Sequence, residues 1–152
     1  MSRPLEILLV EDDPADADLA RLGLRRARVK NRVHVVNTAE HAALFLDRSR
    51  PYGRAPRPDL VFLDLVLPGA PGVTVLERIR GMPQIGTIPV VVLTGTATPS
   101  LVADLYGKGA SCVLKKPVEL ALLLEASAVL DGFFAALGSA SSLPPIEPQL
   151  TG

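Results

Sequence analysis

Residues 59–69 read Asp59-Leu60-Val61-Phe62-Leu63-Asp64-Leu65-Val66-Leu67-Pro68-Gly69. Between Pro58 and Pro68 this is an apolar run that begins after Asp59 and is interrupted by a single carboxylate, Asp64. A short run of this kind is typical of a strand buried on both faces in the middle of a parallel sheet. Because an ionised carboxylate is costly inside an apolar strand, we expect Asp64 at the strand's carboxyl end. Ligands bind at that edge of open α/β sheets, so Asp64 is the first candidate functional residue.

The composition is that of one ordinary domain. The chain has 152 residues, of which 48% are hydrophobic and 4% aromatic, so aliphatic side chains must fill the core. Sixteen Lys and Arg residues balance sixteen Asp and Glu residues, which argues against a chain built to coat nucleic acid or an anionic membrane. The single Cys112 excludes an internal disulfide and is consistent with a reducing cytoplasm, where we expect the protein to work.

Alternating strand and helix patterns predict the fold. Besides residues 59–64, apolar segments at residues 5–10, 33–37, 88–93 and 111–115 are expected to be strands. Helices are expected after Asp13, from Thr38 to about Arg48, after Gly72, from Thr98 to about Lys108 and over residues 118–137. Five strands and five helices with right-handed crossovers predict an α/β, doubly wound, five-stranded parallel sheet with the flavodoxin-like strand order 2-1-3-4-5.

The first helix has clear signals at both ends. Asp13 can cap it with Pro14 at the first position, and we expect Ala15, Leu19 and Leu22 to form its inward face. Residues 21–32 are rich in arginine, which we interpret as a solvated face rather than a nucleic-acid site. Neither histidine, His34 nor His41, has partners at ligand spacing, so we interpret both as structural or exposed.

The last helix is apolar on two opposite sides. Residues 118–137 are long enough to cross a membrane, but acidic residues near the middle of a span cost about 2.5 to 3.5 kcal/mol each, so a soluble helix is expected. One sheet cannot bury both faces. We therefore predict a homodimer through the second face, formed by Leu122, Ala126, Val129, Phe133 and Ala136. Residues 1–137 would form the domain, and the Ser- and Pro-containing tail at 138–152 is too short for an output domain.

Polar side chains follow four of the expected strands. They are Glu11, Asp12 and Asp13 after the first, Asp64 after the third, Thr94 after the fourth and Lys116 after the fifth. Clustered carboxylates repel one another unless a cation neutralises them, and hard oxygen ligands suit Mg²⁺. With Lys116 also drawing off charge, Asp64 could attack phosphorus in line, and Thr94 could hydrogen-bond the transferred group.

These motifs resemble the receiver domain of two-component response regulators, over residues 5–137. The matching motifs are Glu11-Asp12, Asp64 to Pro68 with Gly72, Thr94-Gly95 and Lys116-Pro117. The resemblance implies that Asp64 accepts a phosphoryl group from a sensor histidine kinase and later loses it by hydrolysis. It also implies a Mg²⁺ site at Glu11, Asp12, Asp64 and the main-chain carbonyl of Val66, and a cis peptide bond before Pro117.

Three further stretches look like the single-domain regulators that partner bacterial phytochromes. They are residues 10–16, the Pro-containing loop at 50–58 and residues 131–134 with the tail that follows. That subgroup tends to dimerise through its last helix and strand. The resemblance thus implies a stand-alone signalling protein, not an enzyme, that acts through protein partners and serves a phytochrome-like kinase.

Two departures from the family pattern affect what the resemblance implies. Val113 stands where many receivers have Tyr or Phe, so a ring switch at this position is not expected. Val66 stands two residues after the acceptor, where a polar side chain is common. Because a valine cannot orient an attacking water, we expect the Asp64 phosphate to decay slowly.

Other functions remain open from the residues alone. Thr94-Gly95-Thr96-Ala97-Thr98 would suit a flavin-binding flavodoxin-like domain, although the acids after the first strand would repel a phosphate. A receiver that acts as a phosphorylation-independent interaction module is another alternative. A small-molecule phosphatase with an aspartyl nucleophile would need a second Asp where Val66 stands.

Overall fold

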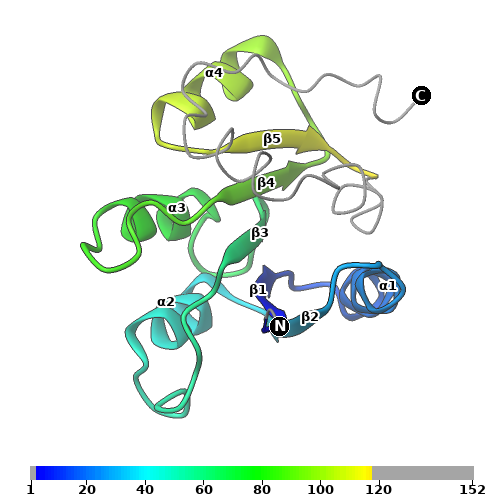
Figure 1. The fold of residues 1–152 in the computed structure, drawn as a ribbon. Coiled ribbons are helices and arrows are strands. Elements are labelled where there is room, and N and C mark those ends of the chain that lie inside the picture. Colours follow the sequence, from blue (N-terminus) through cyan, green and yellow to red (C-terminus); the bar gives the residue numbers. More distant parts are fainter. Residues whose placement is uncertain (1–2, 118–152) are drawn as a thin grey trace.

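The computed structural model describes residues 3–117 and shows one parallel sheet (Figure 1). Its strands are β1 (Leu5–Val10), β2 (Asn31–Val36), β3 (Leu60–Asp64), β4 (Val90–Thr94) and β5 (Cys112–Lys115). They lie in the order β2-β1-β3-β4-β5, and every neighbouring pair is parallel. The predicted strand order is therefore confirmed.

Four of the five expected helices fall within the described residues. They are α1 (Pro14–Arg25), α2 (Ala39–Asp47), α3 (Val73–Arg80) and α4 (Pro99–Gly107). The expected fifth helix at residues 118–137, its dimer face and the tail lie outside the described residues. Within residues 3–117, no helix is long and apolar enough to cross a membrane.

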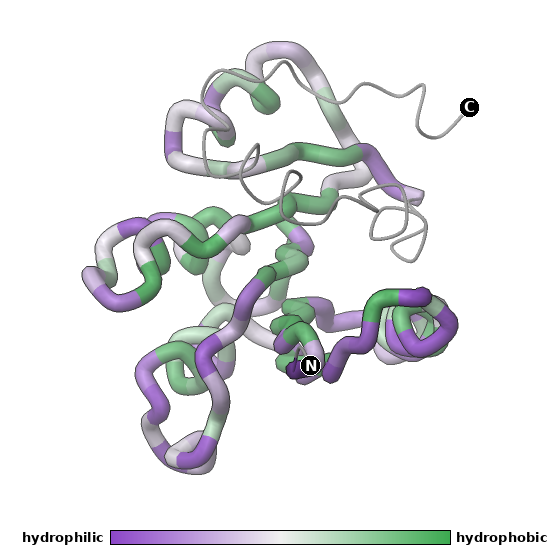
Figure 2. Tube along the Cα trace, in the orientation of Figure 1, coloured by the Kyte–Doolittle hydropathy of each residue, from purple (hydrophilic) through white to green (hydrophobic). Residues whose placement is uncertain are grey.

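The sheet separates two hydrophobic cores. Helices α2, α3 and α4 pack on one face, and α1 packs on the other (Figure 1). All residues of β3 and β4 are buried, as the uninterrupted apolar runs predict for central parallel strands. Figure 2 shows the hydrophobic residues concentrated along these strands.

Side-chain caps fix where three helices begin. Asp13 Oδ1 accepts a hydrogen bond from the Ala15 N–H at 2.8 Å. Thr38 caps α2 through the His41 N–H, and Thr98 caps α4 through the Leu101 N–H. Asp and Thr are residues that commonly cap helices, so these three helix starts could be predicted from the sequence.

The inward face expected for α1 was wrong. Ala17 and Leu24 are buried, whereas Leu19 is 68% exposed and Leu22 is 42% exposed. Ala20 is partly buried against the same core, as is Ala27 just after the helix, and this spacing of three and four residues is that of one helix face. The face of α1 that packs on the sheet is therefore formed by Ala17, Ala20 and Leu24, and the expected Ala15, Leu19 and Leu22 are exposed.

A partly buried arginine joins the amino-terminal starts of β4 and β5. The Arg80 guanidinium at the end of α3 donates hydrogen bonds to the carbonyls of Gly86, Ile88 and Gly109 and to Ser111 Oγ. Ser111 Oγ in turn accepts the Val90 N–H at 3.0 Å. Arg80 thereby satisfies polar backbone groups at the sheet edge opposite Asp64.

Candidate functional site

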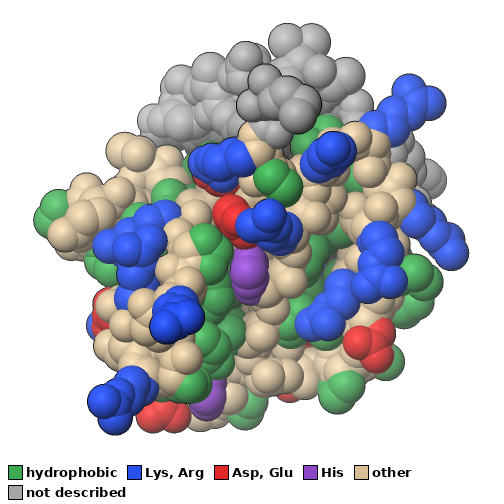
Figure 3. All heavy atoms as spheres, turned by 60° about the horizontal axis from the view of Figure 1, so that its bottom comes forward, with side chains coloured by type: hydrophobic (Ala, Val, Ile, Leu, Met, Phe, Trp, Pro, Cys, Tyr) green, Lys and Arg blue, Asp and Glu red, His purple; other side chains and the backbone are tan. Residues whose placement is uncertain are grey.

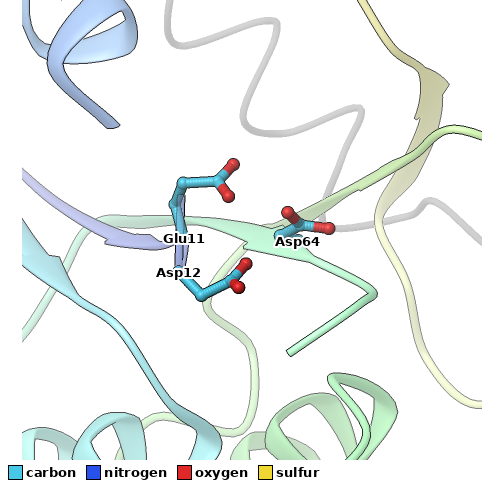
Figure 4. Close-up of side chains that lie close together, drawn as sticks. All are labelled: Glu11, Asp12 and Asp64. Atoms are coloured by element: carbon cyan, nitrogen blue, oxygen red, sulfur yellow. The ribbon is translucent and has the colours of Figure 1, made fainter. Parts of the chain in front are cut away.

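Three carboxylates meet at the carboxyl ends of β1 and β3. Glu11 and Asp12 follow β1, Asp64 ends β3, and one oxygen from each lies within 4.8 Å of the other two. Figure 4 shows the side chains of Glu11 and Asp12 extending towards Asp64. Glu11 and Asp64 are buried, with 4% and 6% of their surface exposed, whereas Asp12 faces solvent. The predicted acidic cluster is therefore present.

Lys116 supplies the positive charge at this cluster. Its Nζ lies 2.8 Å from Asp64 Oδ2 and 3.2 Å from Glu11 Oε1. The Lys116 N–H donates to the Thr94 carbonyl at 2.8 Å, which ties the residue to the end of β4. The Lys116–Pro117 peptide bond is cis, as the family resemblance implied.

Backbone N–H groups hold the other carboxylate oxygens. The Val66 N–H donates to Asp64 Oδ1 at 3.0 Å, and the Asp13 N–H donates to Glu11 Oε2 at 3.2 Å. Each Asp64 oxygen thus accepts one hydrogen bond from a different donor. Fixing both oxygens in this way orients the carboxylate before any ligand arrives.

The glycine at position 72 allows the loop after β3 to turn back on the strand. A Cβ built on Gly72 would lie 2.4 Å from the main-chain oxygen of Asp64 and 2.8 Å from that of Leu65. The Gly72 N–H also donates to the Leu65 carbonyl at 3.0 Å. Glycine is therefore required here, because any side chain would prevent the loop from packing closely against the end of β3.

The electrostatics of the site favour a cation. Burial raises the pKa of Glu11, and the neighbouring Asp64 carboxylate raises it further. Burial opposes the charge of Lys116, but its bonds to Asp64 and Glu11 outweigh this and raise the pKa of Lys116. One ammonium group thus faces three carboxylates, and the excess negative charge and hard oxygen donors fit a divalent cation.

Thr94 is in the predicted place, and its hydroxyl bonds its own loop. The residue is 3% exposed at the end of β4. Its Oγ1 donates to the Thr96 carbonyl at 2.7 Å and accepts the Thr96 N–H at 3.1 Å. A transferred group would therefore have to compete with the Thr96 carbonyl for the hydroxyl proton.

Tyr106 is a residue of interest that the sequence did not reveal. The Val113 N–H, on β5, donates to the Tyr106 hydroxyl of α4 at 3.2 Å. A tyrosine therefore contacts position 113 through its hydroxyl although residue 113 is a valine. No local pattern pairs these residues, because the contact depends on how α4 packs beside β5. Lys115, the neighbour of Lys116 at the end of β5, is exposed.

Comparison with known proteins identifies the family. The family model of the response regulator receiver domain matches residues 7–128. This chain belongs to the response regulator receiver domain family. The receiver also resembles the response regulator Rcp1 of Synechocystis sp., with 34% identity over 131 residues that cover 86% of this chain and 89% of Rcp1.

Solved structures of response regulators are also similar to this chain. The phosphorylated cyanobacterial phytochrome response regulator RcpA superposes with a TM-score of 0.73 at 32% identity, covering 88% of this chain and 95% of RcpA. The bacteriophytochrome response regulator RtBRR gives 0.69 at 32% identity, covering 96% and 84%. The Mn²⁺-bound form of Rcp1 gives 0.71 at 31% identity, covering 92% and 94%. This receiver is thus related to phytochrome response regulators, and the related Rcp1 has been solved with a divalent metal.

Proposed function

We propose that this receiver accepts a phosphoryl group on Asp64 from a phosphohistidine of a sensor histidine kinase. The observation that carries the proposal is the Asp64 carboxylate itself. It is buried, held through both oxygens by Lys116 and the Val66 N–H, and adjacent to Glu11 and Asp12. A carboxylate oriented in this way is suited to act as a nucleophile towards phosphorus.

The transfer is a single in-line displacement. One Asp64 oxygen forms a bond to phosphorus as the bond from phosphorus to the kinase imidazole nitrogen breaks, and the imidazole keeps that electron pair. Lys116 offsets the charge that passes to the Asp64 side. The Thr94 hydroxyl hydrogen can rotate away from the Thr96 carbonyl and be donated to a phosphoryl oxygen, which is charged and therefore the stronger acceptor.

The acidic cluster would hold Mg²⁺ during this reaction. The residues that fit it are Glu11, Asp12, Asp64 and the main-chain carbonyl of Val66. When bound, Mg²⁺ would neutralise charge on the phosphoryl oxygens. The support for this ion is the donor set together with the Mn²⁺-bound form of Rcp1.

The phytochrome relatives suggest the partner. Because RcpA and RtBRR are phytochrome response regulators by name, we propose a phytochrome-like histidine kinase as the phosphoryl donor. We further propose that the protein works in the cytoplasm, acts through protein–protein interaction rather than as an enzyme, and dimerises through residues 118–137.

Acetyl phosphate tests the central step without a kinase. Incubation with acetyl phosphate and Mg²⁺ should add one phosphoryl group to the protein, as read by intact mass spectrometry, and Asp64→Asn should prevent it. EDTA should also prevent it. Failure of the unaltered protein to be phosphorylated by acetyl phosphate or by candidate phytochrome-like kinases would favour a phosphorylation-independent interaction module instead.

A further inference from the structure

The zero net charge conceals a strong separation of charge. Residues 19–57 contain ten basic side chains and two acidic ones, Glu40 and Asp47. The basic residues are Arg21, Arg25, Arg26, Arg28, Lys30, Arg32, Arg48, Arg50, Arg54 and Arg57. The acids of the Asp64 site lie at the carboxyl ends of the strands, so the two charge groups occupy different parts of the domain.

The basic residues flank the edge strand β2. One group lies at the end of α1 and the start of β2, and the other lies at the end of α2 and in the loop before β3. Figure 3 shows Lys and Arg side chains gathered on this side of the molecule, with few acidic side chains among them. This surface is therefore complementary to a negatively charged partner.

Part of the basic surface has partners, and part does not. Arg32 and His34 both contact the buried Glu6, and Arg57 donates to the Leu46 carbonyl. Within residues 3–117, no ion pair is found for Arg48, Arg50 or Arg54, and all three are exposed. These three guanidinium groups are available to bind carboxylates.

A pocket of about 390 Å³ opens beside β2, and Arg54 is one of its lining residues. It is lined by His34, Val35, Phe45, Pro51, Tyr52, Arg54, Ala55 and Pro56. The Phe45 ring contacts both the His34 and Tyr52 rings, with centroid distances of 5.5 Å to each. The Tyr52 hydroxyl is held 2.8 Å from His41 Nδ1. The pocket is thus a preformed site lined by aromatic rings and prolines, with one cationic side chain, Arg54.

The edge of β2 offers a further means of binding. β2 pairs with β1 on one side and is the last strand of the sheet on the other. Among residues 3–117, no strand or loop backbone bonds to its outer side. An extended peptide can add to such an edge through main-chain hydrogen bonds while a neighbouring pocket takes one of its side chains.

We propose that the outer edge of β2 binds an extended acidic segment of a partner protein. The segment lies alongside β2 as an additional strand, places one apolar or aromatic side chain in the Phe45–Tyr52 pocket and pairs its carboxylates with Arg48, Arg50 and Arg54. This surface does not include the Asp64 site, so the segment can bind without covering the phosphoryl acceptor.

Two other classes of anionic partner fit less well. Single-stranded nucleic acid would favour a row of stacking aromatics, whereas this surface has one pocket beside an unpaired strand edge. A membrane surface would favour exposed apolar side chains. In the described part of the chain, the exposed large hydrophobic residues are Leu19, Leu22 and Val66, and none lines this pocket.

Fluorescence anisotropy tests the proposal with a defined probe. The probe is a short labelled peptide that alternates glutamate with valine around one central phenylalanine. We expect saturable binding that Tyr52→Ala weakens and that Arg48→Glu, Arg50→Glu and Arg54→Glu together weaken about tenfold or more. Amide hydrogen exchange of β2 should slow when the peptide is present.

Matched controls separate this site from general charge effects. Arg54→Glu should weaken binding, whereas Lys115→Glu, with the same charge change on an exposed residue of β5, should not. Asp64→Asn should bind the peptide normally, so failure here is distinguishable from failure of the phosphoryl-acceptor function. The proposal is overturned by absence of saturable binding, by equal binding of polyglutamate, by equal effects of both charge reversals, or by tighter binding of anionic vesicles or single-stranded DNA.

Discussion

Lys116 Nζ lies between two buried carboxylates, 2.8 Å from Asp64 and 3.2 Å from Glu11. Because Lys116 offsets the charge that builds up on Asp64 during transfer, replacing it with methionine should slow phosphorylation by acetyl phosphate about 100-fold. Lys115→Met is the matched control and should leave the rate unchanged, since Lys115 is exposed. An unchanged rate in Lys116→Met would refute this role of the ammonium group.

Mg²⁺ should stabilise the folded protein. The carboxylates of Glu11, Asp12 and Asp64 converge, and an ion at free concentration c that binds only the folded state adds RT ln(1 + c/Kd) to the free energy of unfolding. We expect the thermal midpoint measured by calorimetry to rise with Mg²⁺ concentration, and Asp12→Asn to reduce this rise. Without added metal, Asp12→Asn should be slightly more stable than the unaltered protein, because one repelling charge is gone. An equal Mg²⁺ response in both proteins would contradict the assignment of Asp12.

Val66 should set the lifetime of the phosphorylated state. Its side chain is 74% exposed beside the acceptor and carries no group that can position water. Val66→Asn should accelerate loss of the phosphoryl group, by up to about 100-fold if the amide aligns the attacking water. Val66→Ala should not accelerate it. The rate is read from phosphorylated protein after the donor is removed, and decay within seconds in the unaltered protein would disprove the slow-decay hypothesis.

Gly72→Ala should damage both the fold and the site. Its Cβ would lie 2.4 Å from the Asp64 main-chain oxygen, so the loop or β3 must shift, at a cost of about 1–3 kcal/mol in the free energy of unfolding. Gly53→Ala is the control, because a Cβ there meets nothing within 4 Å. Urea denaturation measures the difference, and equal stability of the two variants would show that the loop adapts freely.

Asp59 should make stability depend on pH in the acid range. The Arg3 guanidinium, aided by the Glu6 N–H, lowers the pKa of Asp59 below its usual 3.8. A carboxyl group whose pKa is lower in the folded state than in the unfolded state stabilises the protein above pH 3.8. This stabilisation is lost as the pH falls through the pKa of the folded state. Asp59→Asn should therefore be less stable at neutral pH and approach the unaltered protein in strong acid. A constant difference across that range would exclude this linkage.

Local chemistry explains which features could be predicted from the sequence. The buried strands are continuous apolar runs, and Glu11, Asp64 and Lys116 follow such runs directly, so parallel strand order was enough to bring them together. The inward face of α1 could not be inferred from hydrophobicity, because the small Ala17 is buried while the more hydrophobic Leu19 is exposed. The contacts of Arg80 and Tyr106 are made to backbone groups of distant segments, and such contacts have no signature in sequence spacing.

The total charge was also a poor guide to surface behaviour. Sixteen charges of each sign cancel, yet the arginines around β2 and the carboxylates around Asp64 occupy separate regions. The domain consequently has a permanent electric dipole moment, and its rotation as it nears a charged partner is biased before any contact forms. The two faces of one neutral molecule can thus favour different partners, because the dipole turns the basic face towards an anionic partner and the acidic face towards a cationic one. This orienting effect weakens as ionic strength rises.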